Sequence, residues 1–170
     1  MQKSLFLLII LSLLSSCKSK KTALNVSGKS NSVILSGCPE NSTCALEIKN
    51  NSALTLTTEP DGKPFYTIIP QNGTTVYRYE MTQNQDQQYM DGGYREEIIF
   101  QLPSDFKNGV LSDKELLQTN ALFGVFCYCK GKAGYYSIGK GTITKTDQSI
   151  RISIPELVEG QKVMEIEFKF

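Results

Sequence analysis

The sequence predicts an all-β fold: a single antiparallel β-sandwich, or a partly open barrel, of about ten short strands with at most one short helix. Three observations predict it. Segments of alternating apolar and polar residues recur at short spacing, turn signals separate them, and one stretch carries a helix-start pattern. The 170 residues, 40% hydrophobic and 21% charged, suffice for one domain with its own core.

The first half of the chain supplies strands and their turns. Residues 33–35 open the series, and Cys44, Leu46 and Ile48 then share one face of the next strand. Further β-rich segments follow at 53–58, 65–69, 74–81 and 94–101. Asn72-Gly73 is a strong hairpin signal, so we expect a tight turn between 65–69 and 74–81.

The second half contains the expected helix and the remaining strands. Ser112 and Glu115 fit a capping box ahead of Leu116 and Leu117, which predicts a helix of about six residues. Residues 122–129 lack a polar face, as expected of a central strand buried on both sides. Strands are then expected at 135–138, 141–146, 149–154 and 163–170.

The last of these segments alternates cleanly between apolar and charged residues. Its inward face should hold Met164, Ile166, Phe168 and Phe170. Glu165 and Glu167 then point outward, and a solvated strand face explains them. Together with the adjacent Glu96 and Glu97 they are the paired carboxylates of the chain, but no spacing singles out a glycosidase cleft.

Composition excludes several kinds of chemistry. The chain has no His, which removes Ser-His-Asp and Cys-His mechanisms and every His-containing zinc site. The acidic residues show no calcium-loop spacing. A formal net charge of +1 provides no field for nucleic acid. We therefore expect no catalytic residues, no metal, no cofactor and no nucleic-acid partner.

The N-terminus has the features of a targeting segment. Lys3 precedes an almost wholly apolar run at 5–14, which is too short to span a bilayer. Leu14-Ser15-Ser16-Cys17 follows, and this order of residues resembles the lipobox of bacterial lipoproteins. The resemblance implies a signal peptide at 1–16 and an acylated Cys17. The polar residues that follow predict a tether, so that 17–28 is the acylated cysteine with its tether and the strand pattern places the β-sandwich domain at 29–170.

A lipidated Cys17 implies a membrane-anchored protein of the bacterial cell envelope. Lys18 rather than Asp follows the cysteine, and by the same resemblance this favours the outer membrane. The stretch at 18–21 is basic, whereas surface-export tags in some lipoproteins are acidic, which favours a protein that faces the periplasm. Removing residues 1–16 also removes Lys3, which leaves equal numbers of basic and acidic side chains and a formal charge of zero.

Four further cysteines suggest two disulfides in an oxidising compartment: Cys38, Cys44, Cys127 and Cys129. In an extended strand the last two share a face at roughly 7 Å, too far for a direct bond unless the strand bends. We favour cross-links between the first two and the last two. Local pairing within each set and a reduced set remain alternatives.

A glycine-rich, basic and aromatic stretch at 130–142 is the candidate ligand-binding hairpin. Its candidate residues are Lys130, Lys132, Tyr135, Tyr136 and Lys140. Tyrosine faces contact sugars and lysines pair with carboxylates, so a glycan or protein ligand is plausible chemistry. The simpler interpretation is a hairpin whose tyrosines pack or lie half-exposed.

These features give three hypotheses for function. The first is a non-enzymatic binding module anchored to the envelope membrane. The second is an inhibitor of a secreted protease or lysozyme, with the 38–44 loop pre-ordered by a disulfide. The third is a thiol-disulfide oxidoreductase that uses Cys127 and Cys129.

Overall fold

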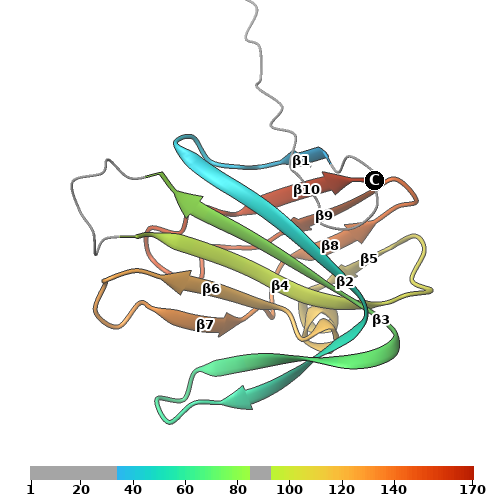
Figure 1. Cartoon of the computed structure of the whole chain (residues 1–170), viewed down its shortest axis with the longest axis horizontal. Coiled ribbons are helices and arrows are strands. Elements are labelled where there is room, and N and C mark those ends of the chain that lie inside the picture. Colours follow the sequence, from blue (N-terminus) through green and yellow to red (C-terminus); the bar gives the residue numbers. More distant parts are fainter. Residues whose placement is uncertain (1–33, 85–92) are drawn as a thin grey trace, which may run out of the picture.

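The computed structural model describes residues 34–84 and 93–170, which form two packed antiparallel sheets (Figure 1). Sheet A has the order β1 (Ile34–Ser36), β10 (Glu165–Lys169), β9 (Ser149–Ser153), β8 (Thr142–Lys145), β5 (Gly109–Ser112). Sheet B has the order β2 (Ser42–Thr58), β3 (Pro64–Gln83), β4 (Arg95–Pro103), β6 (Leu122–Phe126), β7 (Gly134–Ser137). The predicted all-β sandwich is confirmed. The signal peptide, Cys17 and the whole of the tether lie outside the described residues.

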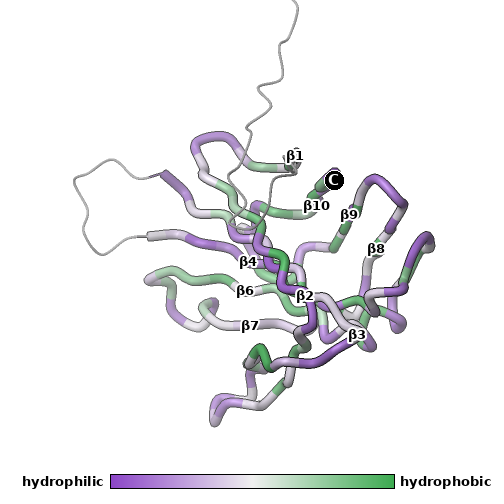
Figure 2. The backbone as a smooth tube through the Cα atoms, turned by 45° about the vertical axis from the view of Figure 1, so that its right-hand side comes forward, coloured by the Kyte–Doolittle hydropathy of each residue, from purple (hydrophilic) through white to green (hydrophobic). Residues whose placement is uncertain are grey.

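The main core lies between the two sheets. Its fully buried aromatic and aliphatic side chains come from both, and they include Tyr79, Ile98, Phe100, Phe123, Ile143, Ile152, Ile166 and Phe168. Burying each such side chain is worth about 1.5–3 kcal/mol. Figure 2 shows β6 as a predominantly hydrophobic segment, whereas the β8–β9 connection is hydrophilic. The apolar 122–126 segment is an interior strand of sheet B, as predicted.

The inward face of β10 is narrower than predicted. Ile166 and Phe168 are fully buried, but Met164 is 37% exposed and Phe170 is 45% exposed. Both lie outside the strand, where the alternation of a pleated backbone no longer sets the direction of a side chain. Glu165 and Glu167 do lie opposite the apolar face, and both take part in ion pairs with Arg151.

The β2–β3 hairpin differs from the prediction. The expected turn at Asn72-Gly73 is wrong, because β3 continues through it and the chain reverses at 59–63 instead. Gly73, at φ 81°, lies opposite the register shift at Asn51, at φ 52°. Its left-handed backbone therefore serves a bend within the long hairpin rather than a two-residue turn.

Beyond this bend, the distal part of the hairpin folds back beneath sheet B (Figure 1). We name residues 52–70 the arm. Leu54, Tyr66 and Ile68 of the arm pack against a second, smaller apolar cluster on the outer face of sheet B, formed by Val76, Ile99, Leu122 and Tyr135. The outer face of sheet B is therefore partly a core in its own right.

The predicted helix is present as the 3-10 helix η1 (Asp113–Thr119). The Glu115 carboxylate accepts the backbone N–H of Ser112 at 2.8 Å, as the capping box requires. Leu116 is buried in the main core and anchors the helix. Within residues 34–84 and 93–170, no helix has the length and apolar character needed to cross a bilayer.

Several connections gather at one end of the sandwich, the left side of Figure 1. We name this the loop end, and it comprises residues 37–41, 127–133 and 154–164. Strand register places them together, since Arg95 pairs with Phe126 and Glu165 pairs with Ser153. Ile34 pairs instead with Lys169, so the described chain begins at the opposite end of sheet A.

Candidate functional site

The β6–β7 connection contains the most exposed aromatic side chain of the described residues. β6 ends at Phe126, the chain bends, and a disulfide joins Cys127 to Cys129 with 5.2 Å between their Cα atoms. Tyr128, between them, is 97% exposed. Within the described ranges, the next most exposed large hydrophobic side chain is Val110, at 58%. Tyr128 thus projects into solvent from a loop closed at its base.

The favoured cross-link between the two cysteine sets is wrong, and the local alternative is what the structure has. Cys38 bonds to Cys44 across the β1–β2 loop, and Cys127 bonds to Cys129. The expectation failed because it extended a strand through 127–129. The bend after Phe126 shortens the separation that an extended chain would impose.

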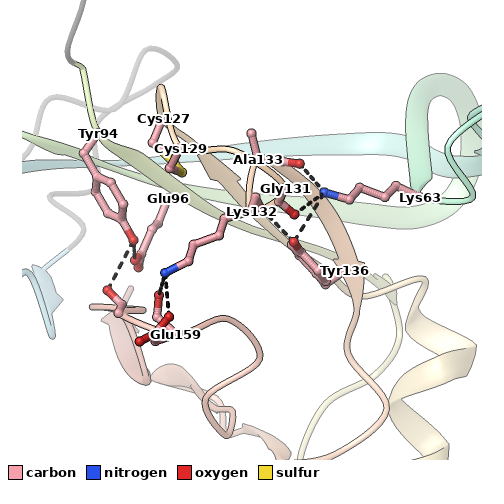
Figure 3. The surroundings of a disulfide bond; sticks show 11 residues. Lys63, Tyr94, Glu96, Cys127, Cys129, Gly131, Lys132, Ala133, Tyr136 and Glu159 are labelled. Atoms are coloured by element: carbon pink, nitrogen blue, oxygen red, sulfur yellow. Dashed lines mark hydrogen bonds and ion pairs between the residues drawn. A yellow bond between two sulfur atoms is a disulfide. The ribbon is translucent and has the colours of Figure 1, made fainter.

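Two lysines follow the Cys127–Cys129 disulfide in the β6–β7 connection, and Figure 3 shows the second, Lys132. Lys130 is exposed, whereas Lys132 pairs with Glu159 of the β9–β10 loop at 2.8 Å. The hydrogen bond and positive charge of Lys132 lower the pKa of Glu159. On the other side, Lys63 of the arm donates to the carbonyls of Gly131 and Ala133. The base of the connection is therefore held from two directions.

The other predicted ligand-binding residues do not join this surface as expected. Tyr135 is only 7% exposed and faces the cluster under the arm, so it is not a surface contact. Tyr136 is half-buried, and its hydroxyl donates to the carbonyl of Lys132. Lys140 lies beyond the far end of β7, near η1, where Gly141 contacts Asp113. Tyrosines on adjacent strand positions point to opposite faces, so this hairpin could not present both.

Glu96 is fully buried and organises the loop end from within. Its carboxylate accepts the backbone N–H groups of Lys162 and Val163, at 2.7 and 2.8 Å, and the hydroxyl of Tyr94. Burial, then the hydrogen bond and charge of Glu96, raise the pKa of Tyr94. Gln161 adds to the order, since its side chain accepts from Leu157 and donates to the carbonyl of Val163. The β9–β10 loop is thus fixed on a buried carboxylate.

Glu97 is also fully buried, but it points to the outer face of sheet B beneath the arm. Tyr66 and Tyr135 donate to its Oε1 at 2.8 and 3.0 Å. Arg78 and Arg95 reach its Oε2 at 2.9 and 3.4 Å. We name these five residues the Glu97 cluster. Burial first, and then the negative charge of Glu97, raise the pKa of Tyr135.

Gly124 makes room for this cluster. It pairs with Tyr135 across β6 and β7, and a Cβ at this glycine would lie 2.6 Å from the Tyr135 ring. The ring can therefore lie across Gly124 and carry its hydroxyl to Glu97, which pairs with the same glycine from β4. The glycine is required by close approach of a ring rather than by backbone conformation.

The Cys38–Cys44 disulfide also lies at the loop end, but it is built into the core. Cys44 is 3% exposed, and the hydroxyl of Tyr79 donates to its Sγ at 3.1 Å. Burial is the main cause of the raised pKa of Tyr79, with the charge of Glu96 second. The loop between the cysteines contains Asn41 at φ 54°, and the Asn41 carbonyl accepts the N–H of Asn84.

The carboxylates of Glu96 and Glu97 are occupied by hydrogen bonds and ion pairs within the protein. Within the described part of the chain, every buried side-chain nitrogen or oxygen has a hydrogen-bond partner. Over the same residues, no group of three or more Cys, Asp or Glu is placed to hold a metal ion. Comparisons with protein-family models, with curated proteins and with solved structures found no match to this chain.

Sequence analysis predicted neither the exposure of Tyr128 nor the burial of Glu96 and Glu97. For Glu96 a signal was present, because it shares its strand face with Ile98 and Phe100, and alternation alone places that face inside. Glu97 shares the opposite, outer face with Ile99, and its burial depends on the arm that covers this face. For Tyr128 no signal was available, because the 122–129 run predicted one strand and concealed where β6 ends.

Proposed function

We propose that this protein is a lipid-anchored lipoprotein of the bacterial cell envelope that acts as a non-enzymatic binding module. Cys17 carries the anchor, and the loop end contacts a protein or glycan ligand. The observation that carries the proposal is Tyr128, which is 97% exposed on a loop closed by the Cys127–Cys129 disulfide. A tyrosine fixed in this way loses little conformational freedom on binding, and tyrosine is enriched at interaction sites.

The position of the first described residue, at the end of the sandwich away from the loop end, supports the proposal. The described chain begins at Ile34, which pairs with Lys169 at the end of sheet A remote from the loop end. The proposed anchor precedes Ile34 in the chain, so it is joined to the described domain at the end away from the loop end. Lys130 adds an exposed charge beside Tyr128, so polar and aromatic contacts can be made together.

The non-enzymatic part of the proposal rests on how the buried carboxylates are used. Glu96 holds a loop through two backbone N–H groups, and Glu97 is surrounded by two tyrosines and two arginines. Both are structural in this arrangement, since a general acid or base needs access to a substrate proton.

A photo-cross-linking experiment in cells tests the binding site. Tyr128 is replaced with p-benzoylphenylalanine, and Asp147, in the exposed β8–β9 turn at the opposite end, is the matched control position. We expect a discrete adduct from position 128 and none from position 147. Sensitivity of that adduct to protease identifies a protein ligand, and sensitivity to glycan-degrading enzymes identifies a glycan. No adduct at 128, or equal adducts at both positions, contradicts the proposal.

The anchor is tested separately. Metabolic labelling with an alkyne analogue of palmitate should label the whole chain and should be lost in Cys17→Ser. The same substitution should release the protein from the membrane fraction. Labelling that persists in the variant would overturn the anchor while leaving the binding site untouched.

A second candidate is an inhibitor of a secreted protease or lysozyme. It is favoured by the local Cys38–Cys44 closure, which pre-orders the 38–44 loop at the same end as Tyr128. The test is direct inhibition of purified lysozymes and of a panel of secreted proteases by the whole chain in detergent. Pro39→Ala and Glu40→Ala should weaken inhibition, and Asp147→Ala should not.

A further inference from the structure

We propose that the Cys127–Cys129 disulfide is a thiol-exchange site, which accepts two electrons from a dithiol while Cys38–Cys44 stays oxidised. This goes beyond the binding proposal and does not depend on it. It gives the loop that carries Tyr128 two chemical states, closed when oxidised and open when reduced.

Access to the sulfur atoms is the first argument. Exchange requires a thiolate to reach a sulfur in line with the bond that breaks. Cys44 is 3% exposed, packs in the main core and has the Tyr79 hydroxyl on its sulfur. Cys38, Cys127 and Cys129 are all half-buried, and the last two flank a residue that is 97% exposed. Attack on Cys38 would release Cys44 as a thiolate inside the core, where burial disfavours the charge. Attack on the second disulfide releases a thiolate that is only half-buried, so this disulfide exchanges more readily.

Independence from the fold is the second argument. The β6–β7 hairpin is held by strand pairing from Leu122↔Ser137 to Val125↔Gly134, without the disulfide. Its connection is also fixed by the Lys132–Glu159 ion pair and by Lys63. Opening a ring that spans only residues 127–129 leaves all these contacts in place. Reduction is thus possible without unfolding.

Reduction of the Cys127–Cys129 disulfide by a dithiol transfers two electrons to the protein in two exchange steps. One thiolate of the dithiol attacks Sγ of Cys129, the Cys127–Cys129 bond breaks, and Cys127 leaves as a thiolate that takes a proton from water. The second thiolate of the dithiol then attacks the mixed disulfide and releases Cys129, which is also protonated. The dithiol leaves as a disulfide, and two electrons have passed to the protein. Cys129 is the attacked atom because Cys127 packs against the margin of the core.

A redox titration of the whole chain in detergent tests the proposal. The native protein is equilibrated with mixtures of reduced and oxidised dithiothreitol, free thiols are trapped with N-ethylmaleimide, and peptides carrying each cysteine are quantified by mass spectrometry. We expect Cys127 and Cys129 to reach half-reduction at a reduced-to-oxidised ratio at least about tenfold lower than Cys38 and Cys44. Reduction of both pairs together, or of Cys38 and Cys44 first, overturns the proposal.

Two controls keep the result specific. In 6 M guanidinium chloride the difference between the pairs should shrink, because burial no longer protects Cys44. In the double variant Cys127→Ser and Cys129→Ser, Cys38 and Cys44 should keep their native resistance to reduction. If their resistance falls to that of the denatured chain, the Cys127–Cys129 disulfide is needed for the fold and the proposal is wrong.

Discussion

The β6–β7 hairpin places two tyrosines in opposite roles. Tyr128, in the connection, is 97% exposed and lies between two bonded cysteines. Tyr135, on β7, is 7% exposed and donates to the buried carboxylate of Glu97. The same side chain is a contact for solvent in one place and a structural hydrogen-bond donor in the other. Local composition therefore does not show which tyrosine of this hairpin is exposed.

Two features of the tertiary structure separate these tyrosines. The arm covers the outer face of sheet B, so Tyr135 meets Tyr66 at 5.2 Å between ring centroids and is shielded from water. Among residues 34–84 and 93–170, none covers Tyr128 in this way, since it is 97% exposed. A hydrogen-bonded, desolvated tyrosine stabilises the fold, whereas an exposed one contributes little to stability and remains free for a partner.

The largest expected effect is the difference in stability between the alanine variants of these two tyrosines. Tyr135→Ala removes a buried ring and leaves Glu97 short of a donor, so we expect a loss of about 3–5 kcal/mol in the free energy of unfolding. Tyr128→Ala should change it by less than about 0.5 kcal/mol. Urea unfolding followed by circular dichroism measures both. Equal losses in the free energy of unfolding would show that Tyr128 stabilises the fold as much as Tyr135 does.

The two disulfides should contribute unequally to the free energy of unfolding, and removing either should cost less than Tyr135→Ala. Cys38→Ala with Cys44→Ala opens a seven-residue loop and takes a buried side chain from the core, so a loss of about 2–4 kcal/mol is expected. Cys127→Ala with Cys129→Ala opens a smaller ring at the surface and should cost no more than about 1.6 kcal/mol. Thermal unfolding of the two double variants in parallel checks the order, and a reversed order contradicts it.

Gly124→Ala tests whether the close approach of the Tyr135 ring to Gly124 is needed to bury that ring. The added methyl would lie 2.6 Å from the Tyr135 ring and 2.9 Å from Phe126, so one ring must move. We expect a loss of about 1–3 kcal/mol, typical of overpacking. In a Tyr135→Ala background the same glycine substitution should cost less, since the ring it meets is gone. A fully additive double variant would argue against this contact.

Alkaline pH should weaken the Glu97 cluster by a smaller amount. Burial and the charge of Glu97 raise the pKa of Tyr135 above its ordinary value of 10.0. Below pH 10 the tyrosine is protonated in both the folded and the unfolded chain, and stability is complete. Above it the unfolded chain loses the proton first, so stability falls, by up to about 1.4 kcal/mol per pH unit for each such tyrosine.

The measurement is urea unfolding of the native protein and of Tyr135→Phe between pH 8 and pH 11. Tyr135→Phe should be less stable than the native protein at pH 8, because a hydrogen bond to Glu97 is lost. Its stability should then fall less steeply above pH 10, because one titrating group is gone. Parallel curves for the two proteins would remove Tyr135 from this explanation.

Much of the fold was readable from the chain. The alternation of Cys44 and Leu46, the apolar segment that became β6, and the capping box of Ser112 and Glu115 all formed as expected. Each is a local pattern, in which burial of one face or satisfaction of one N–H decides the outcome. The predicted turn at Asn72-Gly73 did not form, because the pairing of β3 with both β2 and β4 outweighs a local turn preference.

The candidate site was less readable. The stretch that contains it was found, since Lys130 and Lys132 lie in the loop that presents Tyr128. The burial of Tyr135 was not predicted, because it depends on the arm, and the arm comes from a distant part of the sequence. A contact between residues so far apart in the chain leaves no local pattern.

The sequence by itself determined the class of fold, the absence of histidine chemistry and the residue types at each strand face, because these follow from composition and from two-residue periodicity. The tertiary structure decided which cysteines bond, which tyrosine is exposed and where Glu96 and Glu97 find their donors. Those outcomes depend on where strands end and on which segments fold over them, and only packing of the whole chain fixes such long-range contacts.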